Sequence, residues 1–241
     1  MRKASTEKLS TEERRSKAAR MIGIFLLFTL ICSVIYSFVR FLMAPTEPPD
    51  NRTFTKVKTD YLLMLVQCLL GTLVMMLPSI LAKRFKVVVP SIIVILYFVF
   101  LYCAIYLGEI HNFYYVIPHW DTILHTFSGA MLGALGFILV DFLNKDKNVR
   151  VSLSPIFVAV FAFCFALAIG ALWEVYEFTF DSILGLNMQK HTTETGVALV
   201  GTKALSDTMK DIIVDAVGAL VVVIIGYISE KKSRQAVSEK I

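Results

Sequence analysis

The chain has 241 residues, of which 56% are hydrophobic and 18% charged, and it carries a net charge of +5. Its mean hydropathy is +0.69 and its pI is about 9.0. A soluble domain is about 45–50% apolar and about 25% charged, so this composition argues against a soluble globular protein. The basic residues flank apolar blocks instead of gathering in one stretch, which argues against a nucleic-acid partner.

The apolar residues fall in blocks of membrane-spanning length. A helix needs about 20 apolar residues to cross the ~30 Å hydrocarbon core of a bilayer. The first block is too long for the core of a cleaved signal peptide, so it predicts a span that is retained. The sequence predicts an all-α membrane protein, a bundle of about six transmembrane helices at 21–229 between polar cytoplasmic tails at 1–20 and 230–241. The predicted spans are 21–43, 61–82, 87–108, 122–143, 155–180 and 212–229.

The distribution of Lys and Arg predicts the orientation of these spans. Seventeen of these residues lie in segments on one side of the predicted membrane and six lie on the other. Cytoplasmic segments are enriched in Lys and Arg, so we expect both termini in the cytoplasm. Trp120 and Trp173 then lie near the outer boundary, as an interfacial aromatic belt requires.

The four cysteines do not form a recognisable disulfide or zinc pattern. Each lies in a different apolar block, without CxxC or histidine spacing. We therefore interpret them as small apolar residues of the bundle. They are Cys32, Cys68, Cys103 and Cys164.

Polar residues interrupt the apolar pattern at the outer end of the predicted helix 122–143. Asp121 and His125 are four residues apart, hence about 40° apart around a helix, so they share one face. Gly129 and Gly133 continue near that face as a G-x-x-x-G pair, a spacing that lets a second membrane helix approach closely. This stretch predicts a polar site beside a close helix contact.

Two further acidic faces are predicted at the same end of the bundle. Around the end of the predicted helix 155–180, Glu174, Glu177 and Asp181 are spaced i, i+3 and i+7. Around the start of the predicted helix 212–229, Asp207, Asp211 and Asp215 are spaced i, i+4 and i+8. Asp181, the last of the first series, also fits a solvated loop residue. The candidate polar site consists of Asp121, His125, Glu174, Glu177, Asp207, Asp211 and Asp215.

Ionisable residues within a membrane usually face the bundle interior or an aqueous cavity. So many clustered carboxylates cannot all remain ionised and unpaired in a low-dielectric environment, and Lys210 points elsewhere on an ideal helix. Some are therefore protonated, or a divalent cation or a cationic ligand neutralises them. A metal would be held through His125, Glu174, Glu177 and Asp211, and the sequence identifies no other cofactor.

Structural interpretations stay open for the same residues. His125 alone fits an interhelical hydrogen-bond donor, and Asp121 and Asp207 fit helix N-caps. Four carboxylates fit such roles less well because they lie within or near apolar runs, and for them a purely structural polar network is the alternative: Glu174, Glu177, Asp211 and Asp215.

Three ordered motifs lie in these segments: WD-x3-H-x-x-S-G from Trp120, A-x-x-E-x-x-E from Ala171 and D-T-x-x-D-x6-G from Asp207. In this set, over about residues 60–230, the chain resembles the YjdF-type family of bacterial inner-membrane proteins and, more distantly, VanZ-like proteins. The resemblance implies a multi-pass helical membrane protein, and its VanZ-like part implies a link to the cell envelope or glycopeptide resistance. YjdF-type proteins tend to carry a G-x-Q-G turn before the last motif; this chain has a longer approach there, so Gln189 is not securely matched.

Three classes of function fit a multi-pass envelope protein with this polar cluster. A binding or structural protein, such as an envelope-resistance factor, would use the cluster to hold helices together. A metal-dependent enzyme would act on a lipid or lipid-linked substrate, although the sequence has no H-E-x-x-H motif. A cation- or proton-coupled transporter would use the buried acids as a relay, although the sequence shows no inverted repeat.

Overall fold

The computed structural model describes residues 2–47, 56–86, 88–144, 153–193 and 197–238. These residues form helices and connections, with one isolated bridge between Thr192 and Ala198, so the predicted all-α fold class is confirmed. In the described ranges, six helical segments are long and apolar enough to cross a membrane. The chain divides into two compact units, one ending at Trp120 and the other beginning at Asp121.

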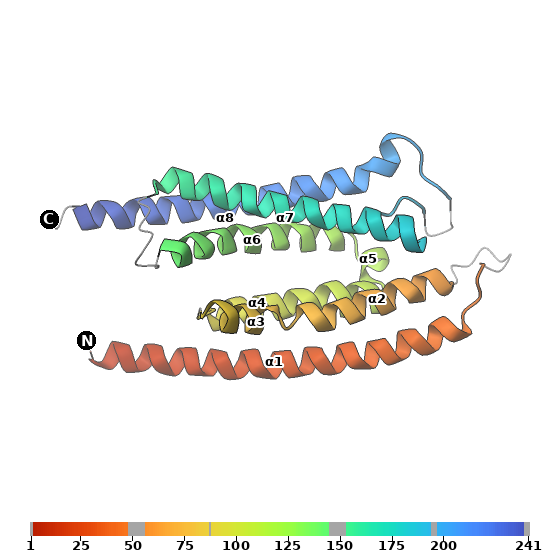
Figure 1. Cartoon of the computed structure of the whole chain (residues 1–241), viewed down its shortest axis with the longest axis horizontal. Coiled ribbons are helices and arrows are strands. Elements are labelled where there is room, and N and C mark those ends of the chain that lie inside the picture. Colours follow the sequence, from red (N-terminus) through yellow and green to blue (C-terminus); the bar gives the residue numbers. More distant parts are fainter. Residues whose placement is uncertain (1, 48–55, 87, 145–152, 194–196, 239–241) are drawn as a thin grey trace. The chain divides into compact units, whose positions relative to one another are not determined.

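The helices follow the apolar blocks in chain order (Figure 1). They are α1 (Arg2–Met43), α2 (Lys58–Val74), α3 (Leu77–Phe85), α4 (Ser91–Leu101), the π-helix η1 (Tyr102–Ile110), α5 (Phe113–Val116), α6 (Trp120–Asn144), α7 (Pro155–Leu184) and α8 (Thr202–Ser238). The candidate spans are Thr11–Met43, Lys58–Arg84, Ser91–Ile110, Trp120–Leu143, Pro155–Leu184 and Thr202–Ala236. Each predicted span overlaps one of these segments. The membrane boundaries and the cytoplasmic location of the termini stay predictions.

Local sequence explains where several helices begin and end. Helix α2 ends four residues before Pro78, and α3 begins beside it, because proline lacks an N–H and its ring clashes with the preceding turn of a helix. Ser154 caps α7 by accepting the N–H of Phe157 at 3.3 Å, and Pro155 takes the first helical position. Gly185 ends α7 with φ of 64°, a left-handed conformation that glycine adopts without steric cost.

Two helices extend beyond the apolar blocks that predicted them. Helix α1 begins at Arg2 and α8 continues to Ser238, so the described parts of both predicted tails are helical. Helix α8 also begins at Thr202, before the predicted span, and this places Asp207 within the helix. The N-cap interpretation of Asp207 is therefore wrong, and that of Asp121 is also wrong because α6 begins one residue before it.

The first unit packs α1, α2, α4 and η1 around an apolar core. Arg40 of α1 donates from Nη2 to the hydroxyl of Tyr61 of α2 at 2.8 Å. The buried core residues are Leu26, Leu30, Cys68, Phe98, Leu101 and Ile105. All four cysteines of the chain are free thiols.

The second unit brings α6, α7 and α8 alongside one another (Figure 1). Gly129 of α6 faces the backbone of Asp215 in α8, and a Cβ on Gly133 would lie 3.2 Å from the carbonyl oxygen of Ala219. The contact is reciprocal, because Gly218 of α8 faces the backbone of α6. This confirms that the G-x-x-x-G pair marks a close helix contact. Such close approach lets short polar side chains on α6 and α8 reach one another.

Candidate functional site

The candidate site lies in the second unit, where α6 begins, α7 ends and α8 begins. Helix α6 supplies one acid and the histidine, α7 supplies two glutamates, and α8 supplies three aspartates. The connection between α7 and α8 adds a lysine that the sequence interpretation did not include. In chain order the side chains are Asp121, His125, Glu174, Glu177, Lys190, Asp207, Asp211 and Asp215.

His125 is oriented by a buried carboxylate of α8. Its Nδ1 lies 3.2 Å from Oδ2 of Asp215, and Asp215 is only 3% exposed. The hydroxyl of Ser128 lies 2.8 Å from Oδ1 of Asp215 and 2.8 Å from the carbonyl oxygen of His125, so its proton can serve either acceptor. Gly170 of α7 leaves the space for this carboxylate, because a Cβ there would lie 2.8 Å from Oδ2. An Nδ1–H held by Asp215 leaves Nε2 as the free nitrogen lone pair.

The Nε2 atom of His125 faces two more carboxylates. It lies 3.8 Å from Oδ1 of Asp121 and 3.9 Å from Oδ2 of Asp211. One ligand atom from each of these three residues lies within 4.8 Å of the other two. Ligand atoms each about 2.0–2.2 Å from a zinc-class cation lie about 3–4 Å apart, and the two separations from Nε2 lie in this range.

Lys190 supplies the positive charge that faces the acids of α6 and α8. Its ammonium is bonded to Asp121 and lies 3.6 Å from Oδ2 of Asp207. Burial lowers the pKa of Lys190, but the two aspartates outweigh burial and raise that pKa above its ordinary value. Lys190 is therefore charged at neutral pH, and it ties the connection to the ends of both helices.

The connection that carries Lys190 is anchored by Asp181. This carboxylate accepts the backbone N–H of Met188 at 2.8 Å and that of Gln189 at 3.0 Å. Gln189 in turn donates from Nε2 to the hydroxyl of Thr208 at 2.8 Å. Asp181 is 8% exposed and lies in the last turn of α7, so the interpretation of a solvated loop residue is wrong. Hydrogen bonding to two backbone groups explains how a carboxylate can be buried there.

The two glutamates of α7 differ in their surroundings. Glu174 is 4% exposed, and neither of its carboxylate oxygens makes a hydrogen bond to a described residue. His125, Asp207 and Asp121 are its electrostatic neighbours, and the Thr208 hydroxyl is near but outside hydrogen-bond geometry. A buried carboxylate in this condition is rare and requires an explanation, such as a proton or a bound ion.

Glu177 is half-buried and accepts the indole N–H of Trp173 at 2.9 Å, one turn back on α7. Of the four residues expected to hold a metal, the structure therefore brings His125 and Asp211 together, with Asp121 as the third member of the group. Glu174 and Glu177 lie outside that group. The signal that could have identified Lys190 is its position: it is the one lysine or arginine of the sequence segment 185–201, which joins two acidic helix ends.

Comparisons with known proteins give a family and no activity. The family described as "Predicted membrane protein (DUF2238)" matches residues 53–232. A protein of Thermotoga maritima, described as "Uncharacterized protein", is 32% identical over 121 residues, which cover 50% of this chain. The match spans 54% of that relative, about half of its length. No solved structure matches the chain.

Proposed function

The chain belongs to the family described as "Predicted membrane protein (DUF2238)", and we propose that it is a multi-pass membrane protein that binds a divalent cation through Asp121, His125 and Asp211. The observation that carries this proposal is Glu174, a buried carboxylate without a hydrogen-bond partner among the described residues, beside a histidine that Asp215 orients. The site lies on the outer face in the predicted orientation.

The donor set favours a cation of the zinc or manganese class. One imidazole nitrogen and carboxylate oxygens suit such ions, whereas an all-oxygen set would favour calcium or magnesium. A metal-binding histidine usually donates its other ring N–H to a carboxylate, and Asp215 is placed for that role. Glu174 lies near His125 and Asp121, and its carboxylate would add negative charge beside a bound cation.

The balance of charge supports the same proposal. Six carboxyl groups surround His125 and Lys190, the two basic groups of the cluster. Lys190 pairs with Asp121 and Asp207, so the remaining carboxyl groups around His125 exceed the positive charge that His125 can supply. A divalent cation would offset this excess in a site that the helices largely shield from solvent.

Metal analysis of the purified protein tests the proposal. We expect the wild type to bind a stoichiometric divalent ion, and His125→Asn and Asp211→Asn to lose it. His111→Asn and Asp141→Asn are matched controls, because neither residue belongs to the cluster, and both should keep the ion. If the wild type binds no stoichiometric zinc, manganese or iron after supplementation, or if the site variants bind like the controls, the proposal is wrong. The isosteric Glu174→Gln, which should weaken binding, covers the case in which a ligand variant does not fold.

A structural lock is the second candidate, and Lys190 is the observation that favours it. Its ammonium joins Asp121 of α6 to Asp207 of α8 without any added ion. In this case the amide variants of the acids would lower thermal stability to the same extent with and without divalent cations. Stability that depends on the cation would instead favour the metal site.

We also propose a relationship to the YjdF-type and VanZ-like proteins, a location in the inner membrane and a role in the cell envelope. Their support is that residues of three ordered motifs, including His125, Glu174 and Asp211, lie in one cluster. A metal-dependent enzyme acting on a lipid-linked substrate and a cation- or proton-coupled transporter would both use such a cluster. Turnover of lipid phosphate esters and cation flux in proteoliposomes, each compared with Asp211→Asn, would separate these two activities.

A further inference from the structure

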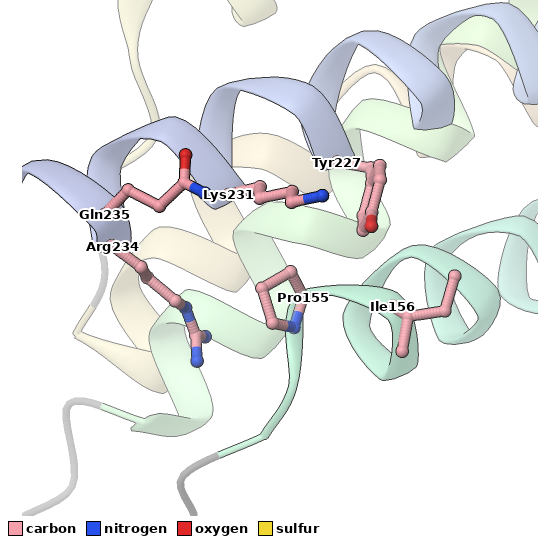
Figure 2. A pocket seen from close by; sticks show the side chains of 6 residues that line it. All are labelled: Pro155, Ile156, Tyr227, Lys231, Arg234 and Gln235. Atoms are coloured by element: carbon pink, nitrogen blue, oxygen red, sulfur yellow. The ribbon is translucent and has the colours of Figure 1, made fainter.

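A shallow cleft lies at the other end of the second unit, between the start of α7 and the last turns of α8 (Figure 2). Its volume is about 300 Å³. Two residues come from α7 and four from α8, and in Figure 2 the Lys231 side chain extends along α8 toward Tyr227. The lining residues are Pro155, Ile156, Tyr227, Lys231, Arg234 and Gln235.

The cleft lies where the apolar parts of both helices end. Pro155 is the first residue of the apolar span of α7, and the predicted span of α8 ends at residue 229, just before Lys231. Tyr227 fits the aromatic enrichment at membrane–water boundaries. Ile156 is 57% exposed and gives the cleft an apolar side toward the hydrocarbon region. The position therefore corresponds to the level of lipid headgroups.

The charge of the cleft suits an anion. The Lys231 ammonium lies 5.9 Å from the centre of the Tyr227 ring, and Arg234 donates from Nη2 to Oε1 of Glu230 at 2.6 Å. That bond uses one of five guanidinium donors, and both basic side chains are exposed. The N-terminus of α7 adds the partial positive charge of the helix dipole, although Pro155 has no N–H and the N–H of Phe157 is capped by Ser154. An anion in the cleft would meet two cationic side chains and one helix end.

We propose that this cleft binds the phosphate headgroup of an anionic phospholipid, with an acyl chain along the apolar surface beside Ile156. Basic pockets between membrane helices bind such headgroups, and the apolar side favours a lipid over free phosphate. In the predicted orientation the lipid belongs to the cytoplasmic leaflet. The cleft is at the opposite ends of α7 and α8 from the His/carboxylate cluster, so this inference does not depend on the proposed metal site.

Lipid binding to the full-length protein in detergent tests the proposal. The probes are phosphatidylglycerol, phosphatidylcholine and inorganic phosphate, measured by native mass spectrometry and by the shift in thermal unfolding. We expect the wild type to retain phosphatidylglycerol over phosphatidylcholine. The double variant Lys231→Gln/Arg234→Gln should bind phosphatidylglycerol about 10–30-fold more weakly, since each basic residue near the surface contributes about 1 kcal/mol.

The control is Lys203→Gln/Lys232→Gln, which removes the same charge from α8 at residues that do not line the cleft. It should bind phosphatidylglycerol like the wild type. Equal weakening in both double variants would reduce the effect to net charge and overturn the proposal. Stabilisation by inorganic phosphate that equals stabilisation by phosphatidylglycerol would also overturn it, because the ligand would then be free phosphate. A wild type that does not prefer the anionic lipid contradicts it directly.

Discussion

The His125 imidazole is held on one side by Asp215 and faces two aspartates on the other, so Asp215 is a positioning residue in the proposed metal site. Loss of such a carboxylate partner costs about 10–100-fold in metal affinity. We therefore expect Asp215→Asn to bind the divalent ion about 10–100-fold more weakly, measured by competition with a chelator of known affinity. Asp141→Asn should match the wild type. Unchanged affinity in Asp215→Asn would contradict the role of Asp215.

Lys190 and a metal would share the carboxylate of Asp121, so removing the lysine tests both interpretations of the cluster. Lys190→Met leaves Asp121 and Asp207 without their cation, and we expect it to lower the free energy of unfolding by about 1–3 kcal/mol without divalent ions. Saturating divalent cation should restore more stability to this variant than it adds to the wild type, as monitored by thermal unfolding. Equal stabilisation of both proteins would show that cation and lysine do not compete for Asp121.

Single residues also show the limits of the sequence interpretation. Asp121 and His125 were predicted to share a face because their spacing matches the helix period, and they do face each other. Glu177 satisfies the same kind of spacing, yet it bonds to Trp173 of its own helix. Periodicity defines a face, whereas the partner of a side chain depends on helix rotation and on rotamers.

The helices α6 and α8 meet through glycines, and the two glycines of the motif differ in how tightly they are packed. A Cβ on Gly129 would collide with the Asp215 backbone, whereas one on Gly133 would lie 3.2 Å from the nearest atom. Because a backbone cannot yield as a flexible side chain can, Gly129→Ala should lower stability by about 1–3 kcal/mol. Gly133→Ala should cost clearly less and serves as the matched control. Denaturant titration in mixed micelles measures both.

Gly129 also lies next to the site, so Gly129→Ala should weaken binding of the divalent ion by moving His125 away from Asp215. Equal stability and equal metal binding of the two alanine variants would contradict the importance of close approach at this position. The G-x-x-x-G motif predicts a close helix contact but does not identify the partner helix. The partner is α8, because Gly218 provides the complementary surface.

The connection between α7 and α8 was the element least accessible from sequence. It has no periodic pattern, and its shape depends on Asp181 accepting two backbone N–H groups and on Gln189 reaching Thr208. Lys190 itself has φ of 48°, which an isolated chain rarely adopts. Its entry into the cluster therefore depends on contacts between segments that are distant in the sequence.

For the whole molecule, the bias of Lys and Arg predicts that both termini lie in the cytoplasm. The segment 109–120 contains neither residue and should lie outside. A fluorescent protein that matures only in the cytoplasm should be bright when fused after Ile241. A phosphatase active only outside the cytoplasm should be active when fused after Asn112. The reverse pattern for either fusion would contradict the orientation and move the His/carboxylate cluster to the cytoplasmic face.

The sequence by itself determined the all-α fold class, six apolar segments of membrane-spanning length and the faces on which most acids lie. These properties depend on local hydropathy and on the helix period, which act within one segment. Only the tertiary structure decided that Lys190 pairs with Asp121, that Asp215 orients His125 and that Glu174 is buried without a hydrogen bond to any described residue. These features depend on the approach of three helices and one connection, because side-chain partners across segments follow from packing.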